Sequence, residues 1–200
     1  METPPLQEED AAWAGVELDV PAPTVQRLLR DPTLLLRLNP CLEFDSLQRL
    51  ADGTFRIAAA NESNGGRIDT DAACTIDAAG TELVLSYTTG LKRETRIRVE
   101  NVDSGSRLSV TELYSVPPNG PAMAPEQVDR SLLPWMAALR RHVRRDRRFG
   151  WIPGYRRLAE GFWLSMPPRQ RRVAWLIIWT TALEFAVFVA VLAVYLGSSS

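Results

Sequence analysis

The chain of 200 residues has the length of about one domain, and its 24 acidic and 23 basic side chains nearly cancel. A content of 46% hydrophobic and 24% charged residues excludes a wholly disordered chain and a collagen-like one. Two cysteines and one histidine exclude a dense disulfide scaffold. We expect neither a metal site nor a cofactor, because the cysteines lack metal-ligand spacing and no glycine-rich phosphate-binding motif is present.

The near-neutral total hides two blocks of opposite charge. Residues 1–125 hold 19 acidic and 11 basic side chains, whereas residues 126–172 hold 4 acidic and 12 basic ones. In residues 173–200 the only charged side chain is Glu184. The composition therefore predicts an acidic body, a basic segment and an apolar tail.

Residues 1–12 are acidic and are expected to be disordered. Glu8, Glu9 and Asp10 stand in a row, and neither the basic nor the apolar region of a secretory signal peptide is present. We therefore expect the body of the protein in the cytoplasm, with Cys41 and Cys74 as free thiols.

The body, residues 13–116, is predicted to form an antiparallel sheet. A short strand over residues 16–20 is followed by a helical stretch, residues 23–38, that Asp31-Pro32 interrupts. Six segments of alternating polarity, separated by glycine-containing turns, then predict hairpin-linked strands. These segments are 42–50, 54–62, 67–76, 83–89, 93–102 and 107–116.

The alternation also predicts which side chains face the interior. Two small residues, Ala72 and Cys74, share the inward parity of their strand, and Tyr87 has the inward parity of its own. Glu112 and Tyr114 have the parity of the apolar residues around them. The apolar inward residues of segments 83–89 and 107–116 are Leu83, Leu85, Leu108, Val110 and Val116. A carboxylate and two phenols are therefore expected in an apolar interior.

Residues 125–148 predict a long helix with one apolar face. Trp135 and Leu139 lie on this face, and His142 lies at its border. The remaining surface carries Arg140, Arg141, Arg144, Arg145, Arg147 and Arg148. Three interpretations of this arginine run are open: it binds anionic lipid, it is the solvated face of a core helix, or it binds nucleic acid. Because an apolar tail follows and no base-stacking aromatic residues interleave the run, we favour anionic lipid headgroups and expect no nucleic acid.

Residues 149–172 predict an amphipathic segment before the tail. If residues 154–166 are helical, Glu160 and two arginines lie opposite an apolar stripe. The stripe consists of Tyr155, Leu158, Ala159, Phe162, Trp163 and Met166. Together with Trp151, it fits a helix that lies among lipid headgroups and ends at Pro167-Pro168. Packing of this helix on the soluble body is the alternative.

Residues 173–196 are predicted to span a membrane. This run of 24 residues has one charge and neither proline nor glycine. As a helix it reaches ~36 Å, against a hydrocarbon core of roughly 30 Å. Trp175 and Trp179 near one end and Tyr195 near the other fit the two headgroup layers. A buried core helix is the alternative, but such a helix normally shows a polar stripe.

The residues that flank the span predict its orientation. Arg169, Arg171 and Arg172 precede it, whereas an uncharged short tail, residues 197–200, follows it. Because basic residues flank the cytoplasmic end of a span, we expect a single-pass, tail-anchored protein with its N-terminal domain in the cytoplasm and its C-terminus on the opposite side.

Glu184 stands near the middle of the span and is expected to contact other transmembrane helices. An acid at that depth costs ~2.5 kcal/mol or more. Ala182, Ala186 and Ala190 form a ridge of small residues about 200° away around the helix. The span is therefore predicted to pack between at least two helices. The alternative is a lone anchor with a protonated or snorkelling Glu184.

The order of elements resembles the helix-grip domains of the START-like, or SRPBCC, superfamily, which contains polyketide cyclases, coenzyme Q-binding proteins and lipid-transfer proteins. The segment AGVELDVPAPTVQRLLRDPTLLLRLNPCLEF looks like the first strand, two short helices and second strand, and SLLPWMAALRRHVRRDRR looks like the gripped helix. For residues 13–148 the resemblance implies an α+β fold, with an antiparallel sheet wrapped around a long C-terminal helix and a cavity between them that holds an apolar ligand.

The superfamily has no universal catalytic motif, so the resemblance assigns no catalytic residue. The residues expected to line the cavity are Ala72, Cys74, Tyr87, Glu112, Tyr114, Trp135, Leu139 and His142. Acid–base chemistry by Glu112, a phenol and His142 is a weaker alternative, in which burial would raise the pKa of the carboxyl group and lower that of the imidazole.

Two classes of function remain open. The first is a membrane-tethered cytoplasmic module that binds a lipid or another apolar small molecule. The second is an accessory or assembly subunit of a larger membrane complex, held through its transmembrane helix. A hollow cavity would favour the first and a filled core the second. An enzyme such as a cyclase or isomerase is a third, weaker alternative.

Overall fold

The computed structural model describes residues 11–115 and 130–198, which divide into two compact units between Ser165 and Met166. The expectations for the acidic residues before Ala11, for Val116 and for the helix start at residue 125 lie outside the described residues. Within them, β1 begins at Ala11, so residues 11–12, predicted to be disordered, form the start of the sheet.

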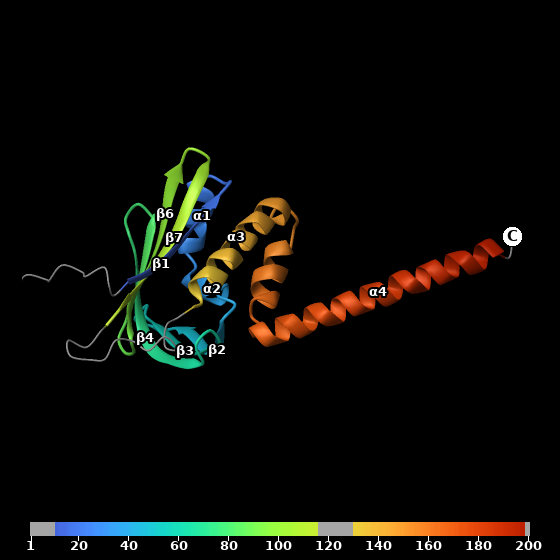
Figure 1. Ribbon diagram of the computed structural model, residues 1–200. Helices are drawn as coiled ribbons and strands as arrows, with labels where there is room; N and C mark the ends of the chain where they lie inside the picture. The colour runs from blue at the N-terminus through green and yellow to red at the C-terminus, as the bar shows by residue number, and fades with distance from the viewer. Residues whose placement is uncertain (1–10, 116–129, 199–200) are drawn as a thin grey trace, which may run out of the picture. The chain divides into compact units, whose positions relative to one another are not determined.

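The first unit is built on a seven-stranded antiparallel sheet with the order β1-β7-β6-β5-β4-β3-β2 (Figure 1). Strands β2 to β7 follow one another as hairpins, and β1 pairs with β7. The strands are β1 (Ala11–Leu18), β2 (Leu42–Arg49), β3 (Phe55–Asn61), β4 (Gly66–Ile76), β5 (Glu82–Tyr87), β6 (Lys92–Val102) and β7 (Gly105–Tyr114).

Two short helices, α1 (Ala22–Leu29) and α2 (Pro32–Arg37), connect β1 to β2. The predicted interruption at Asp31-Pro32 separates them. The Asp31 carboxylate accepts a hydrogen bond of 2.9 Å from the backbone N–H of Leu34, which caps α2, and Pro32 occupies the first helical turn, where no N–H is needed.

A long helix, α3 (Leu132–Phe149), lies on the same face of the sheet as α1 and α2 (Figure 1). It buries the predicted apolar face, including Trp135, Leu139 and Val143. The Trp135 indole N–H donates a hydrogen bond of 2.9 Å to the backbone carbonyl of Leu35, which ties α3 to α2. The α+β helix-grip architecture predicted from the sequence is therefore confirmed.

The centre of the interior between the sheet and the helices is packed. Ala72, Leu85, Leu108 and Leu139 all have an exposed fraction of 0%. A void that could hold a water molecule would leave exposed surface on the side chains bordering it, so no such void touches these residues.

A π-helix, η2 (Arg157–Trp163), follows α3 and belongs to the same compact unit. Its winding is seen in the hydrogen bond of 3.3 Å from the backbone N–H of Leu164 to the carbonyl of Ala159. The expectation of one continuous apolar stripe is wrong, because a π-helix has more residues per turn than the 3.6 assumed for an α-helix. Ala159 and Trp163 are half-buried, whereas Leu158 and Phe162 are exposed.

The second unit contains α4 (Pro168–Ser198). Among the described residues, α4 is the one helix that is long and apolar enough to cross a membrane. The Thr180 hydroxyl donates to the carbonyl of Leu176, one turn earlier in the same helix, at 3.0 Å.

We predict that Trp135→Phe lowers the free energy of unfolding by ~1–3 kcal/mol, because the Leu35 carbonyl loses its buried donor. Denaturant titration of the purified full chain in one detergent measures this change. Leu133→Ala is the control, since Leu133 is 74% exposed on the same helix and its truncation should cost less than about 0.5 kcal/mol. Equal losses for the two variants would contradict the prediction.

Candidate functional site

A buried charge lies on the inner face of β7. Glu112 is 2% exposed, and its carboxylate forms an ion pair with the ammonium group of Lys92, on β6. The Tyr114 hydroxyl donates to the other carboxylate oxygen at 2.6 Å. The buried carboxylate thus has two donors.

Two further polar side chains extend this group towards β5. Thr95 is fully buried and lies directly opposite Glu112 in the β6–β7 register. The Tyr87 hydroxyl is 3.1 Å from the Thr95 hydroxyl, within hydrogen-bonding distance. We call Tyr87, Lys92, Thr95, Glu112 and Tyr114 the inner polar cluster. Three of its members, Tyr87, Glu112 and Tyr114, were predicted from the alternation.

A β-bulge explains why the sequence did not indicate Lys92. Thr95, Ile97 and Val99 are buried on β6, so simple alternation would place Lys92 on the outer face. The register shifts between Lys92 and Glu94, and this extra residue changes the parity of the strand end. Thr95, by contrast, has the inward parity of β6, a signal that could have found it.

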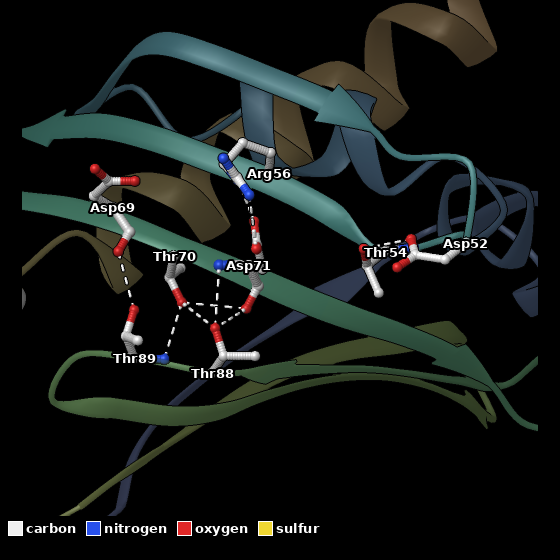
Figure 2. A network of polar contacts seen from close by, with 8 residues as sticks. All are labelled: Asp52, Thr54, Arg56, Asp69, Thr70, Asp71, Thr88 and Thr89. Carbon is white, nitrogen blue, oxygen red and sulfur yellow. Dashed lines mark hydrogen bonds and ion pairs between the residues drawn. The ribbon is translucent and has the colours of Figure 1, made fainter.

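A network of threonines holds β5 against β4 beyond the end of their ladder (Figure 2). The last ladder pair joins Ala72 to Tyr87. After it, the backbone N–H and the hydroxyl of Thr88 both donate to the Asp71 carbonyl, at 2.9 and 3.1 Å. The Thr89 hydroxyl donates to the Asp69 carbonyl at 3.0 Å. These bonds fix the end of β5, from which Tyr87 points into the inner polar cluster.

The Asp71 side chain secures the other edge of β4. Its carboxylate pairs with the Arg56 guanidinium of β3 through two hydrogen bonds, one of them 2.9 Å long (Figure 2). Hydrogen bonding by Arg56 keeps the pKa of Asp71 below its usual range. The outer face of β3–β4 is thus cross-linked by an ion pair.

The other residues predicted to line a cavity lie within the packed interior or at its border. Ala72, Trp135 and Leu139 are buried in the apolar core, and Cys74 is half-buried against it. Ala72 is adjacent to Tyr87 across the β4–β5 ladder. Their role in binding a ligand stays a prediction.

His142 lies apart from the inner polar cluster. It lines a recess of about 200 Å³ between α1, α2, α3 and η2. Its Nε2 is 3.5 Å from a carboxylate oxygen of Glu160, and the His142 side chain is 12% exposed. The sequence predicted that a carboxylate, a phenol and this imidazole lie together in one pocket. In the structure the carboxylate and the phenols lie together, and the imidazole does not.

Ion-paired residues line the recess around His142. The Arg156 guanidinium donates to both carboxylate oxygens of Asp146, at 2.7 and 3.0 Å, and Arg27 lies 3.8 Å from the same carboxylate. Burial lowers the pKa of His142 and raises that of Glu160. Both shifts favour the uncharged forms.

The residues expected at a membrane or partner surface fall into both units. In the first unit Trp151 and Phe162 are exposed and Trp163 is half-buried, while the Tyr155 ring packs against Phe149 at a centroid distance of 5.8 Å. In the second unit the Trp175 and Trp179 rings stack at 6.4 Å. Also on α4 lie Arg169, Arg171, Arg172 and Glu184.

Solved structures share the architecture of the first unit. The Zhui aromatase/cyclase from Streptomyces sp. R1128 has a TM-score of 0.55 and 16% identity, over 70% of this chain and 97% of that one. A START superfamily protein from Mycobacterium smegmatis has a TM-score of 0.50 and 19% identity, over 67% and 97%. For a conserved protein from Geobacillus kaustophilus the values are 0.52 and 14%, over 68% and 96%.

The chain has a START-like fold. At these identities the likeness concerns the fold alone. No protein-family model matches the sequence, and comparison with curated proteins finds no match.

We predict that the recess makes stability depend on pH in two opposing ways. The pKa of His142 is lowered from 6.5, so the unfolded chain binds this proton more readily and stability falls as pH decreases through that value. The pKa of Glu160 is raised from 4.5, so its contribution is present below that value and is lost as pH rises through the folded pKa.

Thermal unfolding of the full chain between about pH 5 and pH 8 tests both signs. His142→Gln should flatten the decrease towards acid pH, and Glu160→Gln should remove the decrease towards neutral pH. Glu100→Gln, on the outer face of the sheet, is the matched control and should leave the profile unchanged. A wild-type profile in His142→Gln would show that His142 is not the group responsible.

Proposed function

We propose that this protein is a membrane-anchored START-like module that binds an apolar molecule bearing one polar group. The observation that carries the proposal is the inner polar cluster, a buried ion pair at one end of an apolar interior. The fold supports it, because solved proteins of this architecture include one named as an aromatase/cyclase and one named as a START superfamily protein.

Folding alone gives little reason for a buried Lys92–Glu112 pair. Removing two charges from water is costly, and well-packed apolar residues in place of a buried pair are often equally stable or more so. The pair is therefore better explained by recognition of a ligand than by stability.

The chemistry of the cluster indicates the kind of polar group. A carboxylate has about four lone-pair positions, and Lys92 and Tyr114 occupy two of those of Glu112, so Glu112 has acceptor capacity left for a ligand hydroxyl. Lys92 is a donor for a ligand oxygen. Its side chain is 20% exposed, so the cluster is reachable from the surface.

The apolar part of such a ligand would lie against Ala72, Leu85 and Leu108. These side chains are fully packed, so entry requires the helices and the sheet to separate or side chains to change rotamer. Binding therefore has the character of a conformational change rather than the filling of a preformed cavity.

The packed interior also favours a second candidate function, an accessory or assembly subunit. A chain of this kind needs no ligand, and its partner would contact α4. Glu184, in the middle of the apolar stretch of α4, favours this role, because a carboxylate among lipid tails is stabilised by a helix that offers it a hydrogen bond.

We predict that the full chain in phosphatidylcholine nanodiscs is labelled by a diazirine-bearing hexadecanol, whose hydroxyl can donate to Glu112, on the peptides of β5 to β7 and α3. Glu112→Gln should reduce labelling of these peptides about tenfold, as expected when one charged hydrogen bond worth ~1.4 kcal/mol is lost. Mass spectrometry of the digested protein gives the yields. Glu100→Gln, a carboxylate on the outer face, should label like the wild type.

Two results would overturn the binding proposal. One is labelling confined to α4. The other is equal labelling of the two variants. If the domain stays unlabelled and native mass spectrometry of the same nanodiscs shows a bound protein chain in addition to this chain and the scaffold protein, the assembly role replaces the binding role.

We predict that alkaline carbonate leaves the full chain in the membrane pellet, because α4 provides 31 helical residues with an apolar stretch. Glu184→Leu should stay in the pellet as well. The control is Leu183→Arg with Val187→Arg, which adds two charges near the centre of the span at ~2.5–3.5 kcal/mol each and should release the chain. Release of the wild type into the supernatant would disprove the anchor.

A further inference from the structure

We propose that the outer side of η2 and the turn before it form a surface that seats the domain on an anionic lipid bilayer. This docking edge consists of Trp151, Arg157, Leu158 and Phe162. The proposal rests on the proposed membrane attachment and adds to it a second, peripheral contact made by the folded domain itself.

The π-helical winding produces the docking edge by dividing apolar residues between two sides. Ala159, Trp163 and Leu164 turn towards the domain, and Leu164 is 8% exposed. Leu158 and Phe162 turn away from it, with exposed fractions of 64% and 58%. One side of η2 is therefore committed to packing, and the other side presents large apolar groups to the surroundings.

The inner side of η2 is firmly held. The paired hydrogen bonds from Arg156 to Asp146 connect the start of η2 to α3, and Glu160 lies beside His142 of the same helix. The exposed groups therefore sit on a supported helix. Leu158 and Phe162 are therefore exposed on a segment that is held in place by hydrogen bonds to α3.

The turn between α3 and η2 adds an aromatic group of the kind that favours headgroup layers. Trp151 is 78% exposed, and its indole N–H donates to the carbonyl of Arg148 at 2.9 Å, which fixes the ring. Two residues without a side chain, Gly154 before η2 and Gly161 within it, leave an open hollow of about 550 Å³ beside Leu158 and Phe162.

The charges around the docking edge select the occupant. Arg145, Arg148 and Arg157 are exposed, and no carboxylate in the described part of the chain forms an ion pair with them. Basic groups beside exposed aromatic and aliphatic side chains match an interface of anionic headgroups above acyl chains.

Chain continuity also favours a bilayer. The first unit ends at Ser165, and α4 begins at Pro168, so the docking edge is linked by a short stretch of chain to the helix proposed to enter the membrane. A bilayer is therefore within reach of Phe162 whenever α4 spans it. A protein partner at the same surface is distinguishable from a bilayer, because it would shield the surface from oxygen as well as from water-soluble molecules.

Nitroxide labels on the full chain in vesicles test the proposal. Cysteines are introduced at Leu158, Phe162 and, as the exposed control on β1, Trp13, in a background of Cys41→Ser and Cys74→Ala. In vesicles of phosphatidylcholine with phosphatidylglycerol, the labels at 158 and 162 should collide several-fold less with a water-soluble nickel complex than the label at 13, and more with oxygen. An interfacial helix immerses its apolar side by roughly 5–10 Å, which gives this signature.

Charge reversal shows whether the arginines contribute. Arg157→Glu should return the labels at 158 and 162 to water in the same vesicles, and high salt should act in the same direction because it screens exposed charges. Arg98→Glu is the matched control, since Arg98 is an exposed arginine on β6. It should leave the accessibilities unchanged.

The outcomes separate the docking edge from the anchor. If the chain floats with vesicles but the labels at 158 and 162 stay as open to the nickel complex as the label at 13, the docking edge is wrong and the anchor stands. If both labels are shielded from nickel and from oxygen, a protein covers the surface and the lipid proposal is overturned. If the chain floats only with phosphatidylglycerol vesicles and salt releases it, the docking edge is supported and the anchor is wrong.

Discussion

The structure depends on burial of one face of α3 against the sheet. Trp135 and Leu139 must leave water, and burying large apolar side chains contributes ~1.5–3 kcal/mol each. Once they pack, the inner face of every strand is defined, and the arginines on the other faces of α3 must point outwards. Glu112 lies inside because it shares the parity of the buried residues of β7.

This constraint explains why local periodicity predicted the strands, the break between α1 and α2, and the inward positions of Tyr87 and Glu112. Periodicity failed where the backbone departs from the regular repeat. The bulge after Lys92 reverses the parity of a strand end, and the π-winding of η2 redistributes a predicted stripe over two sides. Both departures change the residue count per repeat, and no side-chain pattern in the sequence marks them.

The recess around His142 shows a different limit. It is assembled from α1, α2, α3 and η2, so its pairs join residues far apart in the chain, such as Arg27 and Asp146. Amphipathicity alone placed Glu160 on a solvent-facing side, whereas it faces His142. Whether a polar side chain of a helix faces solvent or packs against a domain depends on which polar groups of that domain lie nearby. The periodicity of the helix sequence alone does not contain this information.

The positions of the cluster and the docking edge along the domain bear on how a ligand would be exchanged. Arg147, near the C-terminal end of α3, donates to Asp19, which follows β1 where β1 pairs with the start of β7. Glu112 lies near the other end of β7, and six residues of strand from Ser106 measure ~20 Å. The inner polar cluster therefore lies at the end of the sheet away from the α3–η2 turn. A domain seated on the bilayer by η2 would open its cluster away from the lipid surface, so such a ligand would be exchanged with the aqueous phase or with a soluble partner.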